Sequence, residues 1–249
     1  MSCVSDKVNE VPQDLVLLHG FAGTARAWDP VIERLRGERY RPLALDLPGH
    51  GDRADDDPSI AGTVASILSA AEGDFALCGY SMGGRVALHV ALAAPRRVNR
   101  LILVATTAGI EDPQERHERS RADARLAAFL QTSTIEQFAD RWMKQPIFAG
   151  TPKDAAEIWR EDLLRNDPYP LAGVLRATGT GELRPVWDRL DALTMPATVI
   201  AGSEDRKYVA LAERLAEALP DGELHIVEGA GHGLAREAPA ELAALIEAA

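Results

Sequence analysis

The stretch "LCGYSMGGRVALHVA", Leu77 to Ala91, decides the fold because it joins an apolar strand to an alanine-rich helix through one serine. Its centre, Gly79-Tyr80-Ser81-Met82-Gly83, matches G-x-S-x-G, in which small flanking residues let the backbone turn sharply and expose the serine hydroxyl. The apolar run before it and the helix-compatible run after it supply the required context. Ser81 is therefore predicted to be a nucleophile on a strand-to-helix elbow. The alternative is a turn that matches the pattern by chance.

Strand-like and helix-like patterns alternate along most of the chain. Helix-compatible runs, the first at 25–36, separate apolar strand signals at 14–20, 40–51, 75–80, 100–106, 197–205 and 223–233. This order predicts an α/β fold with a mostly parallel sheet covered by helices on both faces. Few residues precede the first strand at Leu15, so we expect six or seven strands and no antiparallel N-terminal hairpin.

The alternation stops between residues 109 and 185. This segment is helical in pattern, mixed in charge and rich in arginine, and the strand–helix order resumes after it. We therefore expect one α/β core, formed by 1–108 and 186–249, with 109–185 inserted as a helical cap. A length of 249 residues fits one such domain with its insertion.

Composition limits the classes of partner. The net charge is −11, and the 23 arginines and 4 lysines are scattered, so there is no basic stripe for nucleic acid. The apolar runs are strand-sized and "MSCVSDKVNE" has no apolar signal region, which predicts a cytoplasmic protein without a membrane span. Cys3 and Cys78 give neither a disulfide framework nor metal-ligand spacing, and Cys78 is expected in the core. We expect no metal and no organic cofactor.

Polar residues directly follow several predicted strands, at the edge where an open parallel sheet binds its ligands. A catalytic serine needs a base within hydrogen-bond reach, and the base needs a carboxylate that orients it. His232, in the loop "GAGHG", is the preferred base, and Asp205, after "TVIAGSE", is the preferred acid. His19 is the alternative base and Glu204 the alternative acid. The other interpretation of Asp205 is a helix N-cap alone.

Backbone N–H groups are expected to supply the electrophilic half of the site. One belongs to Met82, directly after the serine, and the other to Phe21 in the loop "HGFAG". His19, beside this loop, is expected to shape it. The other histidines are expected to be structural (His89 in a helix, His225 in a strand) or have no role that the sequence reveals (His50 in a turn, His117 in the cap).

Over nearly its full length the chain resembles the α/β-hydrolase superfamily, and within it the 2-succinyl-6-hydroxy-2,4-cyclohexadiene-1-carboxylate synthases of menaquinone biosynthesis. The resemblance rests on "HGFAGTARAW", "GYSMGGRVAL" and "GSEDRK" in the core, and above all on "ERSRADARLA", "RWMKQPIFA", "LLRN" and "TGTGELRPVWDRL" further along. It implies the α/β-hydrolase fold. It also implies a carbon–oxygen lyase in which the triad removes a carbon-bound proton and pyruvate is eliminated from a succinyl, enolpyruvyl cyclohexene carboxylate.

The resemblance also implies residue roles. Its triad falls on Ser81, Asp205 and His232. Its anchoring groups for a small substrate with several carboxylates fall on Tyr80, Arg85, Trp142, Arg165 and either Arg119 or Arg121, where the spacing to Asp123 favours Arg119. Guanidinium groups bind carboxylates bidentately, so arginines suit such a substrate. The alternative for each arginine is a solvated surface position, and for Trp142 a contact between cap and core.

Two features depart from the pattern of these synthases. A second histidine often lies three places after the catalytic one, and here that position is Ala235. The tripeptide "SPG" is replaced by Thr107-Ala108-Gly109. Two other functions therefore stay open: hydrolysis of an ester, lactone or vinylogous diketone with Ser81 as nucleophile, and a non-catalytic ligand receptor. A receptor has no need of all three triad residues.

Overall fold

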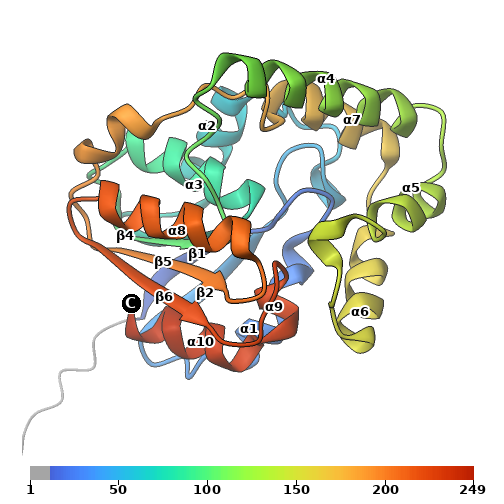
Figure 1. The fold of residues 1–249 in the computed structure, drawn as a ribbon. Helices are drawn as coiled ribbons and strands as arrows, with labels where there is room; N and C mark the ends of the chain where they lie inside the picture. Colours follow the sequence, from blue (N-terminus) through green and yellow to red (C-terminus); the bar gives the residue numbers. More distant parts are fainter. Residues whose placement is uncertain (1–11) are drawn as a thin grey trace, which may run out of the picture.

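The computed structural model describes residues 12–249, so Cys3 lies outside the described residues. Within them, six parallel strands form one sheet in the order β2-β1-β3-β4-β5-β6 (Figure 1). The strands are β1 (Gln13–Leu18), β2 (Tyr40–Leu45), β3 (Phe75–Tyr80), β4 (Val98–Val104), β5 (Ala197–Gly202) and β6 (Gly222–Val227). The predicted α/β fold with a parallel sheet is confirmed.

The two faces of the sheet contribute to two separate apolar cores. Because side chains alternate along a strand, Val16 and Leu18 of β1 enter one core while Leu15 and Leu17 enter the other. Helices cover both faces (Figure 1). On one side lie α2 (Ile60–Ala70), α3 (Met82–Ala93) and α8 (Arg206–Ala218), and on the other α1 (Asp29–Ile32) and α10 (Pro239–Ala248). Every residue of β3 and β5 is buried, which explains why these strands read as continuous apolar runs.

The helices of the core follow the strands, with one difference from expectation. They are α1 (Asp29–Ile32), α2 (Ile60–Ala70), α3 (Met82–Ala93), α8 (Arg206–Ala218), α9 (Leu234–Glu237) and α10 (Pro239–Ala248). The long helix expected at 25–36 is wrong, because this segment forms the 3₁₀ turn η1 (Ala25–Trp28) followed by the single turn α1. The Thr24 side chain caps η1, and Gly37, at φ 73°, turns the chain towards the edge strand β2.

Four helices and a 3₁₀ turn follow β4, and we call them the cap. They are α4 (Pro113–Leu130), α5 (Ile135–Trp142), η3 (Pro146–Phe148), α6 (Lys153–Leu163) and α7 (Pro168–Thr178). Their apolar faces form a third core, which includes Phe138, Leu163 and Leu175. The turn η4 (Trp187–Ala192) then leads the chain back to β5.

Among residues 12–249, no helix is both long and apolar enough to cross a membrane.

Candidate active site

The chain turns from β3 into α3 at Ser81, whose φ of 53° and ψ of −109° lie in a region that residues with a side chain rarely adopt. The neighbouring glycines make this turn possible. A Cβ atom on Gly79 would collide with the backbone of Gly83, and one on Gly83 would collide with the carbonyl of Leu18 in β1. The sequence pattern therefore reflects close backbone approach on both sides of the serine.

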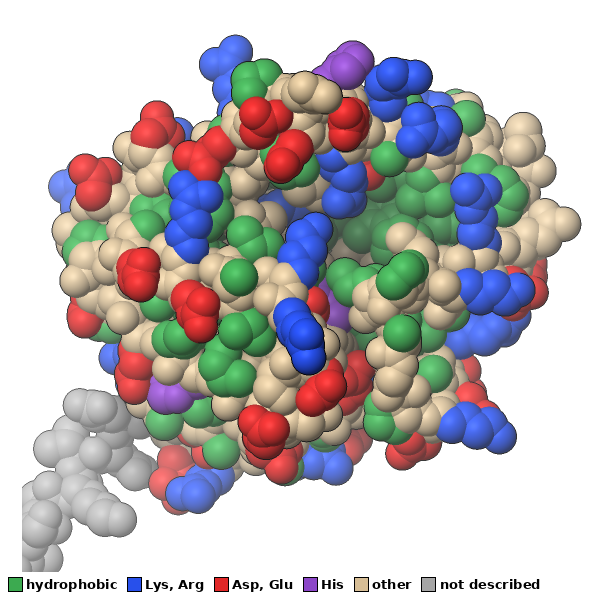
Figure 2. All heavy atoms as spheres, in the orientation of Figure 1, with side chains coloured by type: hydrophobic (Ala, Val, Ile, Leu, Met, Phe, Trp, Pro, Cys, Tyr) green, Lys and Arg blue, Asp and Glu red, His purple; other side chains and the backbone are tan. Residues whose placement is uncertain are grey.

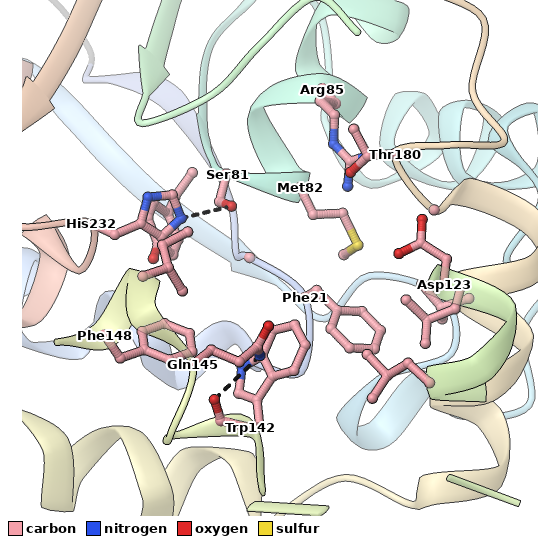
Figure 3. A pocket seen from close by; sticks show the side chains of 18 of the residues that line it. Phe21, Ser81, Met82, Arg85, Asp123, Trp142, Gln145, Phe148, Thr180 and His232 are labelled. Carbon is pink, nitrogen blue, oxygen red and sulfur yellow. Dashed lines mark hydrogen bonds between the residues drawn. The ribbon is translucent and has the colours of Figure 1, made fainter. Parts of the chain in front are cut away.

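Three elements bring the predicted triad together. His232, in the loop between β6 and α9, has its Nε2 3.1 Å from Ser81 Oγ (Figure 3) and its Nδ1 2.7 Å from Asp205 Oδ2. With Nδ1–H donating to the carboxylate, Nε2 accepts the serine proton, which is the arrangement of a general base. Asp205 also caps α8 by accepting from the Tyr208 N–H, so the contact with His232 and the helix cap occur together. Glu204 is exposed.

Phe21 and Met82 line the same site (Figure 3). Met82 is the first residue of α3, so its N–H has no acceptor within the helix. His19 lies buried under the loop, where Nδ1–H donates to the Gly20 carbonyl and Nε2 accepts from the Leu47 N–H at 2.9 Å. This arrangement shapes the loop as the sequence suggested.

His50, for which the sequence revealed no role, is a second support of this loop. It is fully buried, and its Nε2 accepts the Ala22 N–H at 3.2 Å. Its ring meets that of His19 edge to face, with centroids 4.8 Å apart. Burial lowers the pKa of both imidazoles, so both are neutral at pH 7. His89 and His225 lie in α3 and β6, and His117 is exposed on α4.

A cavity of about 550 Å³ opens beside the triad, between the core and the cap. Among the described residues that line it, one carboxylate, Asp123, faces six cationic side chains: Arg85, Arg119, Arg125, Arg141, Lys207 and Arg236. Figure 2 shows lysine and arginine side chains around a hollow with an apolar floor. The cavity is therefore cationic although the whole chain carries a net charge of −11.

Arg85 differs from the other cavity arginines because its guanidinium Nη1 is buried and no described carboxylate hydrogen-bonds to the side chain, although the residue as a whole is half-buried. Its Nη1 has no hydrogen-bond partner among the described residues, and the side chain lies beside Thr180 (Figure 3). Burial lowers the pKa of the guanidinium to about 10, so it stays cationic at neutral pH. A buried cation with a free donor is costly in an empty site and favourable when an anion is bound.

The remaining anchoring candidates divide into two groups. Tyr80 and Trp142 line the cavity, and so does Arg119, whose Nε donates to Asp123 across 2.8 Å. Arg121, two positions after Arg119 in α4, is exposed and does not line the cavity. Arg165, which follows the end of α6, is also exposed and outside the lining. The structure does not bring Arg165 to the site.

Several cavity residues escaped sequence reasoning. The Tyr208 ring lies 4.5 Å from that of His232, and burial raises the pKa of its hydroxyl. Tyr208 lies three residues after Asp205, on the first turn of α8. Residues three apart lie on the same face of a helix, so this spacing could have placed Tyr208 beside the triad. Arg236 reaches the cavity from α9 and pairs with the cap, which no local pattern indicates.

The two departures noted in the sequence have different surroundings. Ala235 is buried in the apolar core beneath α9 and does not line the cavity. Thr107 and Ala108 line a small hollow that also touches Arg85. Within residues 12–249, no cluster of three or more His, Cys, Asp or Glu side chains has the arrangement of a metal site.

Comparison with known proteins agrees with this architecture. Residues 15–245 match the model of the alpha/beta hydrolase family. The chain is 34% identical to a 2-succinyl-6-hydroxy-2,4-cyclohexadiene-1-carboxylate synthase of Enterobacter sp. (strain 638), over 93% of this chain and 89% of the relative. It is 32% identical to the synthase of that name from Salmonella paratyphi C (strain RKS4594), over 91% and 89%. Among solved structures, MenH from S. aureus superposes with a TM-score of 0.88 at 30% identity, covering 95% of this chain and 92% of that one.

Proposed function

The chain belongs to the alpha/beta hydrolase family, and from that premise we propose that it is a carbon–oxygen lyase. The proposed substrate is 2-succinyl-5-enolpyruvyl-6-hydroxy-3-cyclohexene-1-carboxylate, from which pyruvate is eliminated. The other product is 2-succinyl-6-hydroxy-2,4-cyclohexadiene-1-carboxylate, after which the relatives from Enterobacter and Salmonella are named. This reaction is a step of menaquinone biosynthesis.

The observation that carries the proposal is the buried guanidinium of Arg85 in a cationic cavity beside the triad. A neutral ester gains nothing from such a group, which costs free energy when it is desolvated without a partner. A substrate with several carboxylates offsets that cost by supplying charge-assisted hydrogen bonds. We assign anchoring roles to Arg85, Arg119, Tyr80 and Trp142, and omit Arg165 because it is exposed outside the cavity.

In this reaction the triad serves as a base. His232 Nε2 takes the proton of the Ser81 hydroxyl, and the Ser81 oxygen takes the acidic proton from the ring carbon that carries the succinyl ketone. The electron pair of that C–H bond moves through the ring double bond and expels enolpyruvate, which becomes pyruvate on gaining a proton. Asp205 holds the His232 tautomer and stabilises the imidazolium while it exists.

Negative charge develops on the ketone oxygen during proton removal. The N–H groups of Phe21 and Met82 are assigned to stabilise it, since preformed backbone donors need no reorganisation during the reaction. No metal or organic cofactor takes part in this scheme.

Product analysis in ¹⁸O-labelled water tests elimination directly. We expect one pyruvate per turnover, labelled no faster than its ketone exchanges spontaneously, and a cyclohexadiene product without label. We also expect no acylated Ser81 in the mass spectrum. A labelled carboxylate, or acyl-Ser81 formed at the turnover rate, would end the lyase assignment.

The same elbow also favours a second candidate, hydrolysis of an ester, lactone or vinylogous diketone with Ser81 as the nucleophile. The exposed serine, its base and the two N–H donors suit acyl transfer equally well. The arginines separate the two candidates. Replacing Arg85 should barely change turnover of a neutral ester, whereas it should strongly impair elimination from the polycarboxylate.

A further inference from the structure

One buried ion pair joins the cap to the loop that carries His232. Asp162 lies near the end of α6, and Arg236 lies in α9, four residues after the catalytic histidine. Arg236 Nη2 donates to Asp162 Oδ2 across 2.6 Å, and both side chains are 5% exposed or less. The same guanidinium lies over Trp159 of α6, 4.8 Å from the ring centroid.

Asp162 also holds the loop that carries Phe21. The N–H of Thr24 donates to Asp162 Oδ2 across 3.2 Å, and the Thr24 hydroxyl donates to Oδ1. One turn further on, the buried Asn166 side chain donates to the Ala22 carbonyl at 3.1 Å. The end of α6 therefore fixes the backbone just after the Phe21 N–H at two points.

A carboxylate buried in this way accepts from three donors, two on Thr24 after the Phe21 loop and one on Arg236 in α9, the helix that follows the His232 loop. Its desolvation is offset by the charge of Arg236 and the donors of Thr24. Asp162 does not line the cavity, so it cannot act on a substrate directly. Buried ion pairs contribute little net stability compared with well-packed apolar groups, but their geometry fixes the relative position of the elements that they join.

We propose that Asp162 is a positioning residue, which sets the Phe21 loop and the His232 loop at the spacing that catalysis needs. Helix α6 is then part of the catalytic apparatus, although it belongs to the cap. The inference rests on the triad chemistry of the proposed function, but it holds for elimination and hydrolysis alike.

The test uses the full chain and a neutral p-nitrophenyl alkylphosphonate, which phosphonylates an activated serine and releases p-nitrophenolate. This probe needs Ser81, His232 and the N–H donors, but none of the cavity arginines. In the charge-balanced variant Asp162→Asn/Arg236→Gln, we expect the limiting rate of Ser81 labelling to fall about ten- to a hundredfold, the scale of a small misplacement of reacting groups. The probe concentration at half-saturation should stay unchanged.

A second pair on the same helix is the matched control. Arg160 of α6 pairs with Asp140 of α5 across 2.9 Å, but both side chains are exposed and neither touches the catalytic loops. The variant Asp140→Asn/Arg160→Gln should label at the wild-type rate. Wild-type labelling by a folded Asp162→Asn/Arg236→Gln variant, judged by near-ultraviolet circular dichroism, would overturn the proposal.

A milder variant covers the case in which the double variant does not fold. Thr24→Val keeps the side-chain shape and the ion pair but removes the hydroxyl, which donates to Asp162 and also caps η1 by accepting from the Arg26 N–H. We expect its limiting rate to fall severalfold at constant half-saturation, and an unchanged rate would contradict the positioning role. A wild-type enzyme that is phosphonylated but releases no pyruvate would refute elimination while leaving the role of Asp162 supported.

Discussion

At the scale of a single residue, Ser81 combines backbone strain with a hydrogen bond to His232. Its positive φ costs free energy that the surrounding structure must supply, and residues in such conformations cluster at active sites. The benefit is that the side chain points away from both β3 and α3, towards His232 (Figure 3). The hydroxyl therefore lies within hydrogen-bond reach of the base.

Ser81→Ala or His232→Ala should each lower turnover by about three orders of magnitude or more, because triad members act as a unit. Asp205→Ala should cost less, since it leaves serine and base in contact. Steady-state pyruvate release checks this. Near-wild-type activity of Ser81→Ala would show that the elbow serine is not the base.

Arg85 is expected to lower the stability of the fold while it strengthens binding of an anionic substrate. Replacing a buried cation that lacks a carboxylate partner with an apolar side chain should stabilise the fold, so Arg85→Met should raise the free energy of unfolding by about 1 kcal/mol. The same change should lower kcat/KM for the polycarboxylate about ten- to a hundredfold, equivalent to ~1.5–3 kcal/mol. Urea titration and initial rates measure the two effects. A variant that is both less stable and fully active would contradict this role.

At the scale of the element, α4 presents different faces to the cavity and to solvent. Its buried residues Asp123, Ala127 and Leu130 follow helical spacing, and Arg119, one turn before Asp123, lies on the same side. Arg121 falls on the opposite side and is exposed. Two arginines only two positions apart thus have different surroundings because the helix rotates about 100° per residue.

Arg119→Ala should therefore raise KM or lower kcat/KM for the anionic substrate about tenfold, the scale of one charge-assisted hydrogen bond. Arg121→Ala removes the same charge from the same helix without touching the cavity, and should leave both constants near those of the wild type. Parallel initial-rate measurements decide between the positions. Equal losses in the two variants would indicate a general effect of charge on the cap.

At the scale of the whole molecule, the sheet edge supplies the triad while the cap supplies much of the cavity wall. Asp162 and Asn166 of the cap bond the loop after β1, and the buried His19 and His50 support that loop from the core. His50 faces His19, whose charge lowers the pKa of His50. The pKa of His19 is in turn raised by the charges of Asp162 and Asp46 and lowered by that of Arg236. Protonation of either ring would remove the Nε2 acceptor of a backbone N–H, at Leu47 or Ala22.

Because burial depresses the pKa of both imidazoles below the unfolded value of 6.5, the unfolded chain binds more protons in acid. Their contribution to stability is therefore present above pH 6.5 and decreases as the pH falls towards the folded-state pKa. We expect His50→Gln, which keeps an acceptor near Ala22, to lose less stability than the wild type between pH 7.5 and 5.5. Urea unfolding at both values measures this, with the exposed His117→Gln as control. Equal losses of stability in the wild type and in His50→Gln would show that His50 does not contribute to the pH dependence of stability.

Local sequence determined the features that depend on neighbouring residues. The elbow around Ser81 follows from glycines that must approach other backbone, and strand and helix periodicity predicts the sheet. His232 and Asp205 could be selected because parallel strands end at one edge, so residues after different strands come together. The 25–36 segment was mispredicted because its helical pattern is overridden by the path that the chain takes to β2.

Only tertiary structure decided which charges are paired across long stretches of chain. Asp162 and Arg236 are separated by 74 positions, and no periodicity links them. No periodicity links His50 to Ala22 either, although its Nε2 accepts the Ala22 N–H. The exposure of Arg165 depends on how the end of α6 is oriented, which the sequence pattern does not determine. Arg85 is the clearest case: its place in α3 follows from the sequence, but its lack of a partner depends on every element that surrounds it, because burial and pairing are properties of the packed fold.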